Sequence, residues 1–201
     1  MTWARKRGIP EAALLCAFLV PLHAQNGHEH HLAAASKMDG PVTVGGLKFP
    51  DSILVNEHGE KVRFYSDLIK GKTVAINTIF TTCTTICPLM GANFAKVRKL
   101  IGDRPDVTLI SISIDPTEDT PARLSQWQHG FGATGQGWTL LTGDRNDVLA
   151  LLKALQVFTP DKQDHQPVVL VGGDGASAWS RASALMPAAD LAQLILSRAG
   201  H

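Results

Sequence analysis

Apolar and β-branched residues gather in short runs along this chain, and helical patterns separate the runs. Thr73–Phe80 and Asp106–Ile114 have the composition of strands buried in the middle of a sheet. Trp138–Leu141 predicts a shorter strand. Pro167–Val171 and Ala176–Arg181 flank a Gly-Gly-Asp-Gly turn, which is a strong hairpin signal. The chain therefore predicts a sheet of several strands, the last two joined as a hairpin.

A smaller hairpin is expected ahead of these strands, where Ser52–Val55 and Lys61–Phe64 surround an Asn-Glu-His-Gly turn. Helices with an apolar stripe are predicted between and after the strands, at Pro88–Ile101, Thr120–Phe131, Asn146–Val157 and from Pro187 to about Gly200. After the hairpin the order is β, α, β, α, β, α, β, β, α. This order predicts an α/β fold, a sandwich of helices around a mixed sheet.

The length of 201 residues, with 44% hydrophobic and 18% charged residues, fits one compact domain plus a targeting segment. Residues 1–24 combine a basic start, an apolar run and Leu-His-Ala, which resembles a cleavage site. We interpret them as a secretory signal, with a retained membrane anchor as the alternative. Residues 25–44 are expected to be a flexible tether and residues 45–201 the folded domain. The formal net charge of +1 gives no reason to expect nucleic acid as a partner.

Cleavage of the signal would change the number of cysteines in the mature protein. Cys16 lies in the signal, so the mature chain keeps Cys83 and Cys87 alone. The signal predicts a location in the periplasm or on the outer face of the inner membrane. A disulfide across three intervening residues closes too short a loop to stabilise the fold much, so in this oxidising compartment the two cysteines indicate a functional pair. The tether carries His28, His30 and His31, which either bind a divalent metal loosely or form a solvated tail.

The two cysteines lie four residues apart, where a predicted buried strand gives way to a helical pattern. If Cys83 opens that helix, both sulfurs lie on one face, and the helix N-terminus favours their thiolate forms. Two thiolates can close a disulfide or hold a soft metal ion. Thioredoxin-type enzymes use Cys-x-x-Cys, whereas the longer spacing of Cys83 and Cys87 lets both coordinate one ion with room for a third ligand.

Copper(I) suits two thiolates plus an imidazole. His165 lies in a polar loop immediately before a predicted strand and is the candidate third ligand. Ligand sites in such sheets lie beyond the carboxyl ends of parallel strands, and Asp115 follows one such end as the cysteines follow another.

Three motifs occur in order: Phe80-Thr-Thr-Cys83-Thr-Thr-Ile-Cys87-Pro88, Ser113-Ile-Asp115-Pro-Thr-Glu-Asp119-Thr-Pro121, and Asp164-His165 ahead of Val168-Val-Leu-Val-Gly-Gly-Asp-Gly175. Together they resemble the Sco/SenC family over residues 45 to 198. The resemblance implies a thioredoxin-like fold and copper delivery to the CuA centre of cytochrome c oxidase, with a thiol–disulfide reductase role also proposed. By position, it implies copper ligation by Cys83, Cys87 and His165, with Asp115 near the site or at a partner surface.

The resemblance also implies partners: the CuA-bearing oxidase subunit or another cuproprotein, and a thiol–disulfide partner. One pair of residues departs from the family pattern, and one proline would favour the redox role. Thr84 and Thr85 stand where the family often has proline and an acidic residue, which alters partner recognition or thiol pKa. Pro167 stands where thioredoxin-like folds place a cis-proline, and a cis bond there would favour thiol–disulfide exchange.

Overall fold

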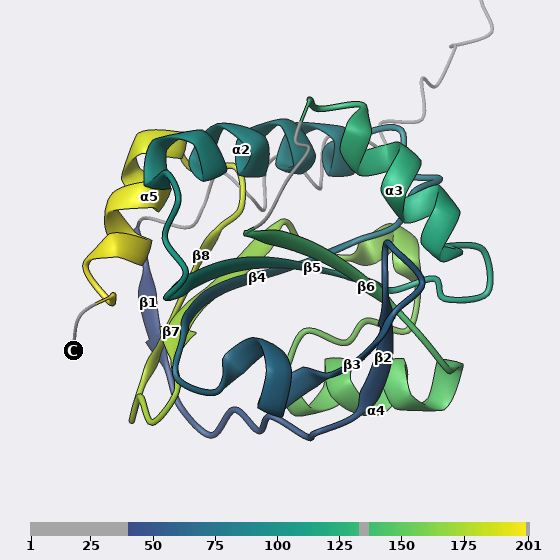
Figure 1. Ribbon diagram of the computed structural model, residues 1–201, viewed down its shortest axis with the longest axis horizontal. Helices are drawn as coiled ribbons and strands as arrows, with labels where there is room; N and C mark the ends of the chain where they lie inside the picture. Colours follow the sequence, from purple (N-terminus) through teal and green to yellow (C-terminus); the bar gives the residue numbers. More distant parts are fainter. Residues whose placement is uncertain (1–39, 133–136, 200–201) are drawn as a thin grey trace, which may run out of the picture.

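The computed structural model describes residues 40–132 and 137–199. Within these residues one mixed sheet of eight strands crosses the molecule, in the order β1-β8-β7-β4-β5-β6-β2-β3 (Figure 1). The strands are β1 (Val42–Val44), β2 (Ile53–Asn56), β3 (Lys61–Arg63), β4 (Thr73–Ile79), β5 (Val107–Ser113), β6 (Trp138–Thr142), β7 (Val168–Gly173) and β8 (Trp179–Ser183).

The centre of the sheet is parallel and its flanks are antiparallel. β4, β5 and β6 run in parallel, whereas β7 lies antiparallel against β4 and continues into the β7–β8 hairpin. Every residue of β4 and β5 is buried, which explains why their sequences are continuous runs of apolar and small polar residues. The predicted mixed sheet and the leading β2–β3 hairpin are confirmed.

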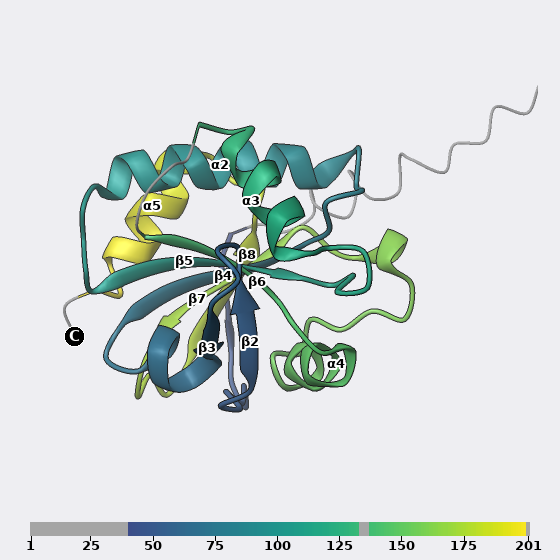
Figure 2. The same ribbon diagram turned by 45° about the vertical axis from the view of Figure 1, so that its right-hand side comes forward.

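Helices cover both faces of the sheet. The helical segments are η1 (Phe64–Ile69), α2 (Ile86–Ile101), α3 (Pro121–His129), α4 (Arg145–Ala154), η2 (Lys162–Asp164) and α5 (Ala188–Leu196). Figures 1 and 2 show α2, α3 and α5 on one face and η1 and α4 on the other. The predicted start of α3 is confirmed, since the Thr120 side chain accepts the Arg123 N–H and Pro121 is the first helical residue.

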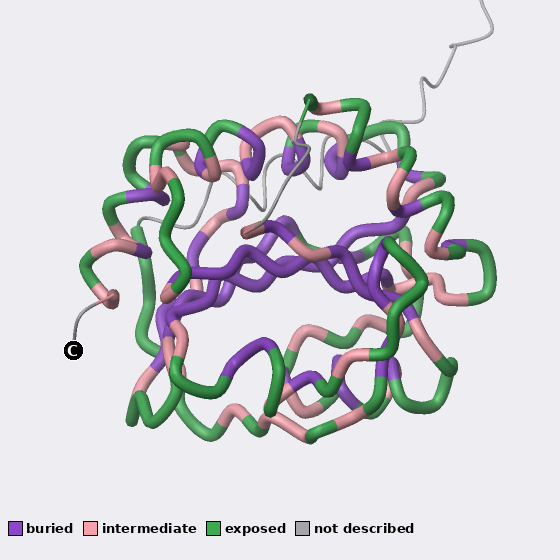
Figure 3. Tube along the Cα trace, in the orientation of Figure 1, coloured by how far each residue is buried: buried purple, intermediate pink, exposed green. Residues whose placement is uncertain are grey.

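The sheet separates two hydrophobic clusters, and its strands are the most continuously buried part of the chain (Figure 3). One cluster packs beneath α2 and α5 and includes Cys83, Cys87 and Met90. Met90 is therefore a core residue, as its helical spacing predicts. The second cluster fills the space between the sheet and η1 and α4, around Phe64 and Leu151. The cysteine pair thus lies at the border of a packed core.

Two boundaries differ from the sequence expectation. Residues 42–44, expected at the end of the tether, form β1, because Val-Thr-Val pairs with Trp179–Arg181 of β8. Helix α2 begins at Ile86, so Cys83 precedes the helix instead of opening it. The proposed signal and the histidines of the tether lie outside the described residues. Among residues 40–132 and 137–199, no helix is both long and apolar enough to cross a membrane.

Candidate metal and thiol site

The sheet topology brings three predicted site segments to one edge. The β4–β5 register pairs Ile79 with Ser113, so the cysteine turn and the Asp115 turn leave the sheet together. The Ile114 N–H donates to the Ile79 carbonyl at 2.9 Å and joins the two exits. Because β7 is antiparallel to β4, its beginning lies at the same edge, and His165 stands three residues before it.

The cysteines form a compact pair at the start of α2. The Cys87 N–H donates to the Cys83 sulfur at 3.4 Å, and the Thr85 hydroxyl lies 3.7 Å from the same sulfur. Thr85 is the N-cap residue, but its side chain makes no capping hydrogen bond. The Cys83 sulfur therefore takes the place of a capping side chain and satisfies one of the open N–H groups of the helix.

The two thiols have opposite electrostatic settings. Both are reduced, with residue exposures of 8% for Cys83 and 0% for Cys87. The hydrogen bond that the Cys87 thiol donates to Cys83 lowers the pKa of Cys83 to about 4. Hydrogen bonds from backbone N–H groups act in the same direction, and together they outweigh the opposite effect of burial. The same hydrogen bond, together with burial, raises the pKa of Cys87. The pair therefore holds one thiolate and one thiol at neutral pH.

His165 lies beneath this edge, 3% exposed. Its Nε2 is 3.2 Å from the Thr78 carbonyl oxygen, and a carbonyl only accepts, so Nε2 carries a proton in this contact. The ring also meets Phe80 edge-on, with centroids 5.7 Å apart. Phe80 in turn accepts the Cys83 N–H on its carbonyl at 3.1 Å, so one residue contacts both halves of the site.

The arrangement brings the two cysteines together but does not assemble a three-ligand set. Within the described ranges, no group of three or more histidine, cysteine, aspartate or glutamate side chains is arranged to hold a metal ion. The donor chemistry nevertheless suits a soft ion, because two sulfurs share one turn and an imidazole is attached to the same edge. Because Nε2–H donates to the Thr78 carbonyl, Nδ1 is the nitrogen that carries the lone pair in the neutral ring, and a ligating histidine commonly donates its other N–H in this way.

A buried carboxylate that the sequence did not reveal as a site residue holds the cysteine turn. Asp119 is fully buried and accepts the Thr81 N–H at 3.2 Å, the Thr81 hydroxyl at 2.5 Å and the Ser113 hydroxyl at 2.6 Å. Its charge contributes to the raised pKa of Cys87, as the last and smallest of the causes. The only sequence signal is that Asp119 lies just before the Thr-Pro cap of α3.

The predicted accessory residue Asp115 lies at the same edge and reaches the histidine segment. Its carboxylate pairs with Lys162 Nζ at 2.5 Å, and its own N–H donates to the Ser113 hydroxyl at 3.0 Å. Lys162 also lies 5.3 Å above the Phe80 ring. Neither the lysine nor its aromatic contact is visible as a site feature in the sequence.

The SCO1/SenC family model matches residues 50–188, a span that contains all of these side chains. The chain belongs to the SCO1/SenC family. Among the solved relatives, BsSco is described as a member of the Sco family of cytochrome c oxidase assembly proteins, and the structure of yeast Sco1 contains copper. The thioredoxin-like α/β fold implied by the sequence motifs is thereby confirmed for this SCO1/SenC protein.

Individual relatives agree with this assignment. The SCO1 protein homolog of Bacillus subtilis is 31% identical over 129 residues, which are 60% of this chain and 66% of the relative. The chain thus spans just under two thirds of that relative's length. A SCO1/SenC family lipoprotein from Bacillus anthracis is 25% identical, with a TM-score of 0.66 over 81% of this chain and 99% of the other. Copper-bound ScoI of Bradyrhizobium japonicum, at 23% identity, has a TM-score of 0.61 over 79% and 98% of the two chains and shows the shared fold.

One observation bears on the redox alternative of this SCO1/SenC chain. No cis peptide bond occurs in the part of the chain that the structure describes, so the bond before Pro167 is trans. The condition under which Pro167 would favour thiol–disulfide exchange is therefore not met. Thr84 and Thr85 are both exposed beside the cysteines and present a neutral surface there.

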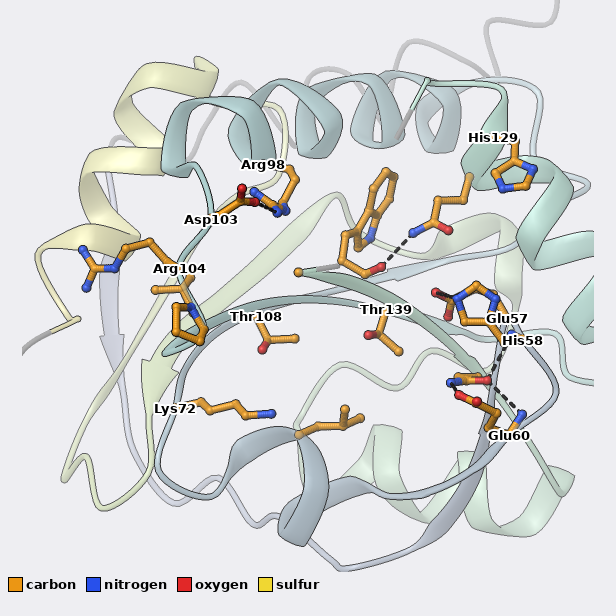
Figure 4. Close-up of a pocket in the computed structure, with 17 residues that line it drawn as sticks. Glu57, His58, Glu60, Lys72, Arg98, Asp103, Arg104, Thr108, His129 and Thr139 are labelled. Carbon is orange, nitrogen blue, oxygen red and sulfur yellow. Dashed lines mark hydrogen bonds and ion pairs between the residues drawn. The ribbon is translucent and has the colours of Figure 1, made fainter. Parts of the chain in front are cut away.

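The molecule also has a groove of about 840 Å³ away from the cysteines, along the open edge of β6 (Figure 4). Two buried side chains cap that edge. Glu57 accepts the Leu140 N–H at 2.9 Å, and Gln128 donates to the Trp138 carbonyl at 2.7 Å. His58 and His129 line the groove from separate elements. The caps satisfy backbone groups that β2 does not reach, which marks the groove as a protected sheet edge.

Proposed function

We propose that this SCO1/SenC protein is a copper-binding assembly factor that holds copper through Cys83, Cys87 and His165. It would deliver the ion to the CuA site of cytochrome c oxidase or to another cuproprotein, in the periplasm or at the outer face of the inner membrane. The observation that carries the proposal is the pair of free cysteines at the start of α2, where the Cys87 N–H donates to the Cys83 sulfur at the same edge that holds His165. Copper is the cargo of this site.

The chemistry of the pair supports binding of a soft ion. A thiolate is the ligand form of cysteine, and Cys83 is held in that form by the Cys87 thiol and by N–H donors of its own turn. Cys87 must lose its proton to become the second ligand, so metal binding releases protons. His165 would supply the imidazole, with its Nε2–H contact to the Thr78 carbonyl fixing the tautomer of the ring. A disulfide between the cysteines would remove both sulfur ligands.

Anaerobic titration of the reduced chain with copper(I), against a chromophoric copper(I) chelator, tests the proposal. We expect one tightly bound ion per chain, and at least a tenfold loss of affinity in Cys83→Ser and in His165→Ala. His129→Ala is the matched control, because His129 is an exposed histidine at the end of α3. Equal affinity of His165→Ala and the control would refute the three-ligand site.

The titration needs one further control, because the tether contains three histidines close together. A variant with His28, His30 and His31 replaced by alanine separates ions held by the tether from the ion held by the folded domain. We expect the tight site to persist in this variant. Loss of the tight site there would move the proposed copper site to the tether.

A second candidate function is thiol–disulfide exchange, which the asymmetry of the two thiols favours. Cys83 is the more exposed of the pair and has the lowered pKa, while Cys87 is buried and protonated. In such a reaction the Cys83 thiolate attacks a partner disulfide and releases one partner thiolate. Cys87, once deprotonated, then attacks the mixed disulfide, so the pair is oxidised and the partner is reduced by two electrons.

His165→Ala distinguishes the two functions. Exchange with a protein disulfide should keep its rate in His165→Ala and be abolished in Cys83→Ser. Copper binding should be weakened in both variants. A rate that falls with His165→Ala as steeply as the copper affinity would contradict a separate redox role.

A further inference from the structure

The loop that follows β5 contacts both halves of the proposed site. At one end of the loop, Asp119 accepts hydrogen bonds from Thr81, two residues before Cys83. At the other end, Asp115 pairs with Lys162, three residues before His165. Two carboxylates four residues apart thus hold the cysteine turn and the histidine segment against the same loop.

Lys162 is the contact that reaches the histidine half. Its Nζ lies 2.5 Å from Asp115 Oδ2, and the Asp115 side chain is only 14% exposed. Its ammonium also lies over the Phe80 ring, 5.3 Å from the centroid. Lys162 is the first residue of η2, and its carbonyl accepts the His165 N–H at 3.4 Å. The lysine is therefore bound to the site through its side chain and to His165 through its backbone.

We propose that Lys162 is a positioning residue for His165: its ion pair with Asp115 and its contact with Phe80 hold the η2 segment so that the imidazole stays at the end of the sheet where the cysteine turn lies. This role rests on the copper site of the proposed function. The Lys162 side chain contacts Asp115 and Phe80, and it acts by restricting the segment that carries a proposed ligand.

The expected effect follows from the cost of ordering a loop. A segment that samples many conformations binds with an affinity reduced by the fraction of time it spends in the competent one. Lys162 is half-buried and Asp115 is mostly buried, so their pair is better placed than a fully exposed one. We expect its loss to weaken copper(I) binding about fivefold, as for a pair at the upper end of the range for partly exposed ion pairs.

Three variants isolate the charge from the packing. Lys162→Met removes the charge and keeps a long apolar chain beside Phe80. Lys162→Arg keeps the charge and should restore most of the affinity. Lys61→Met, which removes an exposed lysine from the edge strand β3, is the matched control and should bind as the wild type does.

Two readouts test whether the effect passes through His165. In the His165→Ala background, Lys162→Met should cause no further loss of copper affinity, because the ligand it positions is gone. In the copper-free protein, hydrogen exchange of the His165 amide should accelerate about fivefold in Lys162→Met and stay unchanged in Lys61→Met. A purely structural effect on the whole fold would instead accelerate exchange in the central strands as well.

The outcomes distinguish the positioning role of Lys162 from the copper site on which it rests. If the wild type binds copper through all three ligands but Lys162→Met matches it in affinity and in His165 exchange, the positioning role is overturned and the copper site stands. A higher affinity in Lys162→Met would also overturn it, because the pair would then oppose binding. If the wild type binds no copper, the proposed function fails, and the exchange measurement alone decides whether Lys162 restrains the segment.

Discussion

Replacing Asp119 tests how the cysteine turn is held. The Asp119→Ala variant removes a fully buried carboxylate that accepts from Thr81 N–H, Thr81 Oγ1 and Ser113 Oγ. All three donors lie in or beside the loops that carry Cys83 and Asp115. We therefore expect the variant to lose global stability and to loosen the cysteine turn.

The magnitude can be worked from these contacts. Each hydrogen bond to a charged acceptor contributes about 1.5–3 kcal/mol, so three donors contribute about 4–9 kcal/mol in favour of the wild type. Burying the carboxylate costs several kcal/mol, which the alanine variant recovers. We expect a net loss of about 3 kcal/mol in the free energy of unfolding. Asp119→Asn, which keeps the shape and one acceptor, should lose about 1 kcal/mol.

The assay is guanidinium unfolding of the reduced protein at pH 7, with Asp190→Ala as control, since Asp190 is an exposed acid in the first turn of α5. The control should lose about 0.5 kcal/mol. Combining Asp119→Ala with Thr81→Val should cost at least about 1 kcal/mol less than the sum of the single changes, because both remove one shared contact. A loss below about 1 kcal/mol in Asp119→Ala, or full additivity, would refute the reasoning.

Three further predictions follow from other contacts. The rate of Cys83 alkylation, followed by mass spectrometry, should show a pKa well below the usual thiol range. Because the folded pKa is lowered, the stability of the reduced protein relative to Cys83→Ser should rise with pH between about 4 and 9. A stability difference that does not change with pH would contradict the lowered pKa. Gly172→Ala should cost about 2 kcal/mol on thermal unfolding because its Cβ would meet the Trp179 ring, whereas Gly45→Ala, in open space, should cost less than about 0.5 kcal/mol. Glu57→Ala should cost about 1–3 kcal/mol by leaving the Leu140 N–H without its acceptor, and a neutral result would show that water replaces it.

The strands and helices could be predicted because burial leaves a direct mark on sequence. β4 and β5 are buried on both faces, so nearly every position must be apolar or small. Such a run can be recognised in the sequence without knowing which strands pair with it. β1 has no such mark. Its three residues gain their conformation from pairing with β8, a contact that only the folded chain supplies.

The start of α2 is hard to read from the sequence for a related reason. Helix starts are usually recognised by a capping side chain, but here the Cys83 sulfur accepts the Cys87 N–H and Thr85 makes no side-chain cap. Asp119 and Lys162 could not be predicted as site residues, because carboxylates and lysines are normally exposed. Their partners come from separate strand ends, so their roles exist only after the sheet has formed.

The asymmetry of the thiols links the two proposed functions in one site. Copper binding and disulfide formation both begin from the Cys83 thiolate, which the fold already supplies. Both also require Cys87 to lose a proton that its hydrogen bond and burial retain. A soft cation replaces that proton directly, whereas in exchange Cys87 must lose the proton before it attacks the mixed disulfide on Cys83. Both proposed reactions therefore release the same proton from Cys87, so the buried thiol controls copper binding and thiol–disulfide exchange alike.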